Sequence, residues 1–161
     1  MLRCIKLLVP CAAVFLSTAA SGVENRLVLG ANPNLSQGAF ELRSGNFEEG
    51  LRLTFLGLRE SASARDRRAA MNNLCAGYAA LGRYDAAIHI CNILLAKNER
   101  DWRAYNNRAL AYMGAGNLDK AKLDVDKGLA INPRSRKLRQ AAELIDERLA
   151  APTLEQAVFH W

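Results

Sequence analysis

Two consecutive segments of this chain, 68–101 and 102–135, match each other at a constant offset of 34 residues. The matched positions are a Tyr, a Gly four residues later and an Ala five residues after that: Tyr78, Gly82 and Ala87 in the first segment, and Tyr112, Gly116 and Ala121 in the second. A fixed period of this length indicates stacked repeats, in which one unit cannot bury its apolar face alone. The sequence therefore predicts an array of repeated units rather than one closed core.

Each segment is typical of two helices separated by a glycine turn. In the first segment, Leu74, Tyr78 and Leu81 recur at helical spacing before Gly82, and apolar residues continue at helical spacing after it. A glycine at the turn permits a left-handed backbone that other residues resist. We find no strand pattern, so the expected fold class is all-α, built from antiparallel helix pairs.

A less regular unit precedes these two, and a single helix follows them. Asn32-Pro33 is a typical helix start, and Gly45 corresponds to Gly82, but at an offset of 37, which places an insertion of three residues near 61–64. Residues 136–150 carry one apolar and one charged face, as a helix that caps an array requires. We therefore expect a helical domain over 32–150, with repeats at about 32–67, 68–101 and 102–135 and the capping helix at 136–150, between a linker at 21–31 and a tail at 151–161.

The first 20 residues have the form of a secretory signal. Arg3 and Lys6 precede an apolar run over 7–16, and small residues follow it. The run is shorter than the roughly 20 residues that span a bilayer. We expect cleavage after Ala20, an exported protein in a periplasm or outside the cell, and no stable membrane insertion of the mature chain.

Charge and histidine content argue against several classes of function. The formal charge is +6, or +4 without Arg3 and Lys6 of the expected leader, and this excess is modest and spread out, unlike the basic face of a nucleic-acid-binding protein. Basic clusters at 65–68 and 134–139 could bind a polyanion, although such clusters are more often solvated helix faces. His89 and His160 stand at no metal-site or catalytic-triad spacing, and no phosphate-binding loop is present. We expect no enzyme activity, no metal site and no cofactor.

Two cysteines outside the leader leave two possibilities open. Cys75 and Cys91 lie on the two helices of one expected hairpin, at similar distances from Gly82. A disulfide is possible if their Cα atoms come within about 7 Å. Otherwise they are two small buried apolar residues, which is the usual fate of a free cysteine.

The motifs resemble those of the tetratricopeptide repeat family. The resemblance rests on Gly-x-Tyr-x-x-Ala at 82–87, on Tyr78 before it, and on Tyr112, Gly116, Ala121 and Pro133 after it; it covers 32–135, less regularly in the first unit. Three departures are Glu41 in place of a Tyr, Leu118 in place of an aromatic residue and Arg108 in place of an apolar one. The resemblance implies a right-handed superhelical array whose concave groove is lined by the first helix of each pair.

The same resemblance implies a non-catalytic scaffold that binds a partner protein or an extended peptide. Asparagine pairs recur at the 34-residue offset, and matching positions in the family often bind a peptide backbone or carboxylates; the expected groove residues are Asn72, Asn73, Arg103, Asn106 and Asn107. Asn at these positions can equally satisfy neighbouring helices. The lysines with which the family's chaperone-tail clamp acts on the first repeat are absent, which argues against acidic C-terminal tails as the ligand.

Two alternative functions remain open at this point. One is self-association, through the groove or through the aromatic tail Phe159-His160-Trp161, which we otherwise expect to fold back onto the array. The other is a thiol-redox role for Cys75 and Cys91.

Overall fold

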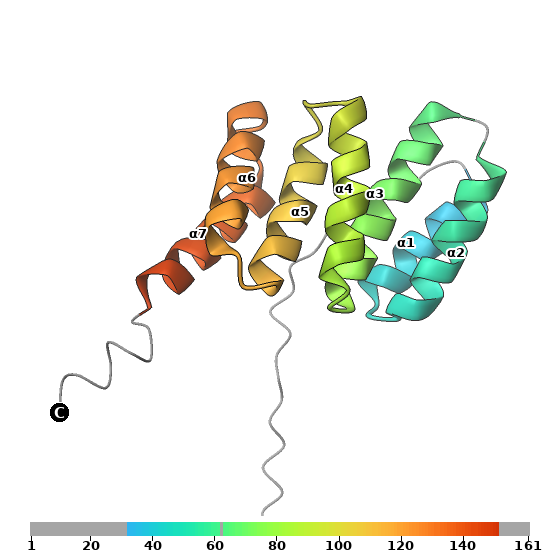
Figure 1. Cartoon of the computed structure of the whole chain (residues 1–161). Coiled ribbons are helices and arrows are strands. Elements are labelled where there is room, and N and C mark those ends of the chain that lie inside the picture. Colours follow the sequence, from blue (N-terminus) through green and yellow to red (C-terminus); the bar gives the residue numbers. More distant parts are fainter. Residues whose placement is uncertain (1–31, 62, 152–161) are drawn as a thin grey trace, which may run out of the picture.

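The computed structural model describes residues 32–61 and 63–151, which form an array of helices (Figure 1). In chain order these helices are α1 (Pro33–Arg43), α2 (Phe47–Glu60), α3 (Ala64–Ala80), α4 (Tyr84–Lys97), α5 (Trp102–Gly114), α6 (Leu118–Ile131) and α7 (Arg136–Ala150). The described residues contain no strand. The all-α array of antiparallel helix pairs followed by one further helix is confirmed. The leader, the linker and the aromatic tail lie outside the described residues.

Short-range chemistry sets where these helices begin and turn. The Asn32 side chain accepts from the backbone N–H groups of Asn34 and Leu35 at the start of α1, and Pro33 occupies the first helical turn, as the sequence predicts. Glycine stands at each turn within a helix pair with a positive φ, of 87° at Gly45 and 72° at Gly82. A residue with a Cβ atom would be strained in that conformation.

One helix start differs from the expectation. The sequence places a repeat boundary at Arg68, but α3 begins at Ala64, where the Ser63 hydroxyl accepts from the backbone N–H of Asp66. The residues inserted near 61–64 therefore extend α3 by a turn instead of lengthening the loop. This extension brings Arg65 and Arg68 into the first turns of a helix.

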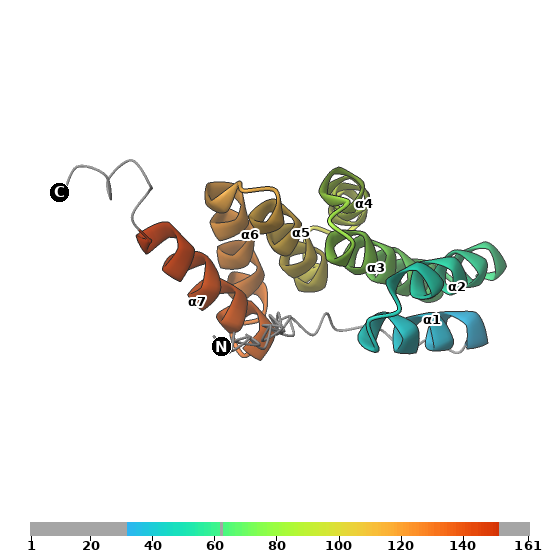
Figure 2. The same ribbon diagram turned by 90° about the horizontal axis from the view of Figure 1, so that it is seen from below.

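The helices form two layers of different curvature. The backbone of each odd-numbered helix lies close to that of the next odd-numbered one, whereas the backbones of α2, α4 and α6 do not approach one another in this way. Figure 2 shows the resulting arc, with α1, α3, α5 and α7 on its inner side. We call the surface of these four helices the concave face and the opposite surface the convex face. The expected inner lining by the first helix of each pair is therefore correct.

Small residues allow the close packing within each helix pair. Ala87 and Ala121 are fully buried, and Gly50 stands at the equivalent position of α2. A Cβ atom at Gly50 would lie 2.9 Å from the backbone nitrogen of Leu42, so α1 and α2 approach more closely than an alanine would permit. Among the described residues, no helix combines the length and the apolar character that a membrane span needs.

Helix α7 closes the array. Leu138, Ala141 and Ile145 are buried against the preceding pair, where α7 packs on both α5 and α6. Charged residues occupy much of its remaining surface. This division of faces is what a capping helix needs, because no eighth helix among the described residues follows to cover it.

Candidate functional site: a basic pocket between α3 and α5

A pocket that brings charged groups together lies between the starts of α3 and α5. It has a volume of about 200 Å³ and is lined by Arg65, Arg68, Ala69, Asn72, Asp101 and Arg103. We call it the α3–α5 pocket. Because α3 and α5 both belong to the inner layer of the array, the pocket is part of the concave face.

Asp101 organises one wall of this pocket. One oxygen of its carboxylate accepts from the backbone N–H groups of Arg103 and Ala104 and so caps the start of α5. The other oxygen accepts from the Asn72 side chain at 3.2 Å, which ties α5 to α3. Both oxygens of the carboxylate are therefore engaged in holding the two helices together.

The arginines supply the positive charge. Arg65 and Arg68 are exposed, and their guanidinium groups have no acidic partner within 4 Å in the part of the chain that the structure describes. The Arg103 guanidinium lies over the Trp102 ring, 4.6 Å from its centroid. Three arginines and one engaged aspartate leave the pocket positively charged. Guanidinium groups in such a cluster suit a carboxylate, which they can bind through paired hydrogen bonds.

The four asparagines expected in the groove are all buried. The Asn107 side chain donates to the backbone oxygen of Asn72, and the Asn106 side chain donates to the Asn107 side-chain oxygen. Asn72 also donates to the backbone oxygen of Arg68. Asn72, Asn106 and Asn107 thus join α3 to α5 or stay within one helix, and only Asn72 and Arg103 of the expected residues line the pocket.

Several polar atoms of these asparagines remain unpaired within the described residues. They are the side-chain oxygens of Asn72 and Asn106 and both polar atoms of the Asn73 side chain. An unpaired buried polar atom costs about 1–3 kcal/mol. Native proteins retain such atoms mainly where water or a ligand satisfies them. The Asn72 side chain lines the α3–α5 pocket, so its unpaired oxygen favours a polar ligand there.

Sequence reasoning found this pocket only in part. It selected Arg103 and the asparagines from the repeat pattern, and it noted the cluster at 65–68 as a separate basic feature. It missed Asp101, although an Asp directly before a helical segment is a typical cap. The sequence did not predict the early start of α3, and this early start places Arg65 and Arg68 at the pocket.

Cys75 and Cys91 are joined by a disulfide with a Cα–Cα distance of 5.9 Å. Both residues are fully buried between α3 and α4. The bridge leaves no thiol at either position. A redox role would require a buried disulfide to react, which its lack of exposure opposes.

A family model supports the repeat assignment. The tetratricopeptide repeat model matches residues 102–135, which are α5, α6 and the turn after them. No curated protein matched the sequence.

Solved structures with the same arrangement of helices include the first TPR domain of human RPAP3. It is 22% identical, with a TM-score of 0.61 over 71% of this chain and 87% of that one. A structure of the first TPR of Spaghetti (RPAP3) bound to the HSP90 peptide SRMEEVD is 22% identical, with a TM-score of 0.59 over 71% and 89%. The TPR domain of P58(IPK) is 18% identical, with a TM-score of 0.65 over 73% of this chain and 33% of that one. At such identities the likeness establishes the fold.

Proposed function

We propose that this chain, which has a matched tetratricopeptide repeat at 102–135 inside a helical array of that fold, is a non-catalytic binding module that holds a protein partner on its concave face. The partner segment is an extended peptide, and an acidic side chain of that peptide enters the α3–α5 pocket. The observation that carries the proposal is the gathering of Arg65, Arg68 and Arg103 around one pocket.

The pocket's neighbours support a peptide rather than a free anion. A small anion needs only the arginines, whereas Asn72, which lines the pocket, also has an unpaired side-chain oxygen. A backbone N–H group of an extended peptide can satisfy such an oxygen. One structural neighbour is itself bound to a peptide, and that peptide contains two glutamates, which supports an acidic ligand on a surface of this kind.

We place this activity in the cell envelope or outside the cell. The support is the leader-like sequence over 1–20, together with the disulfide between Cys75 and Cys91, because disulfides persist in oxidising compartments. Fusion of residues 1–31 to a reporter that is active only after export tests this location.

Capture of partners from the cell tests the binding proposal. The tagged protein is recovered from its own cells after mild crosslinking, and the bound proteins are identified by mass spectrometry. We expect a reproducible partner whose recovery falls by at least about tenfold with Arg68→Glu, because a like charge repels the acidic group. Arg68 is exposed, so its replacement leaves the fold intact.

Lys127→Glu is the matched control, because Lys127 is an exposed cation on α6 in the outer layer. It makes the same change of charge without touching the pocket. Equal loss of the partner with both variants would indicate a general electrostatic effect and contradict the pocket assignment. Replacement of Asn73 or Asn107 is a weaker test, because both side chains are buried and their loss alters helix packing as well.

A further inference from the structure

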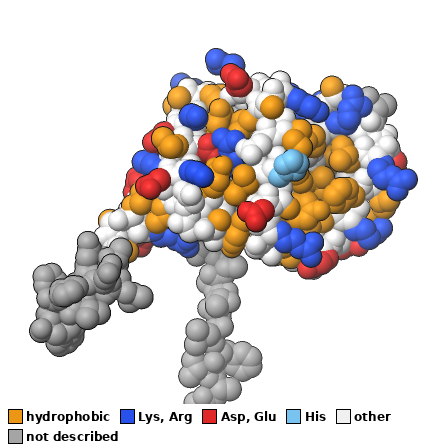
Figure 3. All heavy atoms as spheres, in the orientation of Figure 1, with side chains coloured by type: hydrophobic (Ala, Val, Ile, Leu, Met, Phe, Trp, Pro, Cys, Tyr) orange, Lys and Arg blue, Asp and Glu red, His pale blue; other side chains and the backbone are white. Residues whose placement is uncertain are grey.

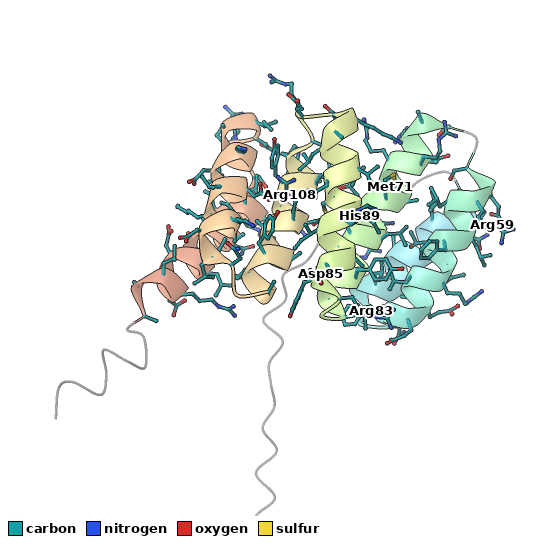
Figure 4. The ribbon with its side chains drawn as sticks, in the orientation of Figure 1. Arg59, Met71, Arg83, Asp85, His89 and Arg108 are labelled. Carbon is teal, nitrogen blue, oxygen red and sulfur yellow. A yellow bond between two sulfur atoms is a disulfide. The ribbon has the colours of Figure 1, made fainter. Side chains whose placement is uncertain are left out.

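Apolar side chains gather on the convex face between α2 and α4. Phe55, Leu58, Tyr78 and Ile90 come from three helices; the last three pack on one cluster, and the Phe55 ring meets the Tyr78 ring edge-on at 6.5 Å. We call these four residues the convex patch. Figure 3 shows this apolar area over α2 and α4, and Figure 4 places His89 at its edge. Phe55 is 42% exposed, so the patch is open to solvent.

Two of the four patch residues, Phe55 and Ile90, map onto polar residues one repeat later, so the fold does not require apolar side chains at these two positions. The repeat offsets map Leu74 onto Arg108, Ile90 onto Asp124 and Phe55 onto Asn92. Arg108 donates two hydrogen bonds of 2.7 Å to Asp124 and one of 2.5 Å to the Asn92 side chain. Three polar side chains, whose hydrogen bonds satisfy one another, thus lie between α4 and α6. Figure 4 labels Arg108 at this place.

The convex patch has no such covering among the described residues. Unpaired cations border it instead: Arg59 on α2 and Arg83 before α4 have no acidic partner within 4 Å in the described ranges. Asp85 is exposed beside Arg83. A segment that fits this surface is apolar, carries an acidic residue and lacks basic ones.

The chain contains one such segment in its tail. Leu154, Ala157, Val158 and Trp161 recur at the i, i+3, i+4 and i+7 spacing of a helix that binds in a groove. Glu155 is the only charged side chain from Leu149 to Trp161, and these residues include no Lys or Arg. The composition therefore complements both the apolar area and the arginines.

We propose that the convex patch binds the 152–161 tail of a second copy of this chain. The donor is a second copy because α7 and α2 lie at opposite ends of the array in both views (Figures 1 and 2). The patch lies between α2 and α4, so the tail would have to pass α6 before its apolar residues met the patch of its own chain. The contact joins two different surfaces, so each copy can donate one tail and accept one.

Analytical ultracentrifugation of the protein purified from its cells tests this contact. The wild-type chain associates as its concentration rises, and excess synthetic peptide 152–161 suppresses that association. Phe55→Gln in the patch and Trp161→Gln in the tail each weaken self-association by at least about tenfold, as expected for aromatic anchors at an interface. Phe40→Gln is the control, because Phe40 is an exposed aromatic residue on α1, and this variant associates like the wild type.

A mixture of the two variants tests whether the patch of one copy binds the tail of another. The Phe55→Gln chain keeps its tail and the Trp161→Gln chain keeps its patch, so an equimolar mixture forms a one-to-one dimer and nothing larger. A wild-type chain that stays monomeric at all concentrations overturns the proposal. Undiminished association of the Trp161→Gln chain alone also overturns it, because the patch would then bind something other than the tail. The concave-face variant Arg68→Glu leaves this association unchanged, which separates the two proposals.

Discussion

The ion pair between Arg108 and Asp124 gives the sharpest prediction about stability. The two side chains are 16% and 5% exposed, and the guanidinium also lies 5.7 Å and 5.9 Å from the ring centroids of Tyr105 and Tyr112. The hydrogen bond to Asp124 raises the pKa of Arg108, so the arginine stays charged at every accessible pH. Removal of either partner leaves a poorly solvated charge without its counter-ion.

We therefore expect Arg108→Leu and Asp124→Ile to destabilise the protein by about 3 kcal/mol each, at the lower end for buried pairs because Arg108 retains some exposure. With a urea m-value of about 2 kcal/mol per molar, each unfolding midpoint falls by about 1.5 M. The double variant recreates the Leu74 and Ile90 pairing of the preceding repeat, and we expect it within about 1 kcal/mol of the wild type.

Urea unfolding followed by circular dichroism measures all four proteins of this cycle. We expect the double variant to lose much less stability than the sum of the two single-variant losses, since it removes both charges together. If the losses from the single variants simply add, the two side chains contribute to stability independently of each other. The argument that the two convex positions are interchangeable would then be wrong.

Three further predictions concern the packing of the array. Reduction of the Cys75–Cys91 disulfide, which closes a loop across 16 positions, lowers the urea midpoint by an amount equivalent to about 3 kcal/mol, whereas a Cys75→Ala/Cys91→Ala variant does not respond to reductant. Gly50→Ala destabilises by about 1–3 kcal/mol because its Cβ atom would press on α1, and an unchanged thermal midpoint would refute the close approach. Ser135→Ala removes the hydroxyl that accepts from the Leu138 backbone N–H and costs about 1 kcal/mol, with faster hydrogen exchange concentrated in α7.

Most of the fold was predictable from the repeat period. Tyr78, Gly82 and Ala87 recur with their partners 34 residues later, and the glycine turns, helix pairs and capping helix all follow from that period. Local chemistry also sufficed to predict the start of α1, where Asn32 caps the helix and Pro33 stands in its first turn. Such features are predictable because each depends on residues within one or two helical turns.

The site was less predictable because it depends on contacts between repeats. The position of Asn107 in the repeat indicated the concave face, but only its bond to the Asn72 backbone shows that the amide is occupied between helices. The departure at Arg108 was visible in the sequence, whereas its two partners come from α4 and α6, 16 residues away in either direction. Side chains that satisfy each other across helices leave no periodic signal.

The central claim is that the concave face holds a protein partner at the α3–α5 pocket. The most direct test is a photo-crosslinkable amino acid at position 65, at the pocket, compared with the same amino acid at position 127 on α6 in the outer layer, both irradiated in living cells. The account predicts a reproducible adduct of one size from position 65, with a partner identified by mass spectrometry, and no such adduct from position 127. The same adduct from both positions, or none from position 65, would contradict it.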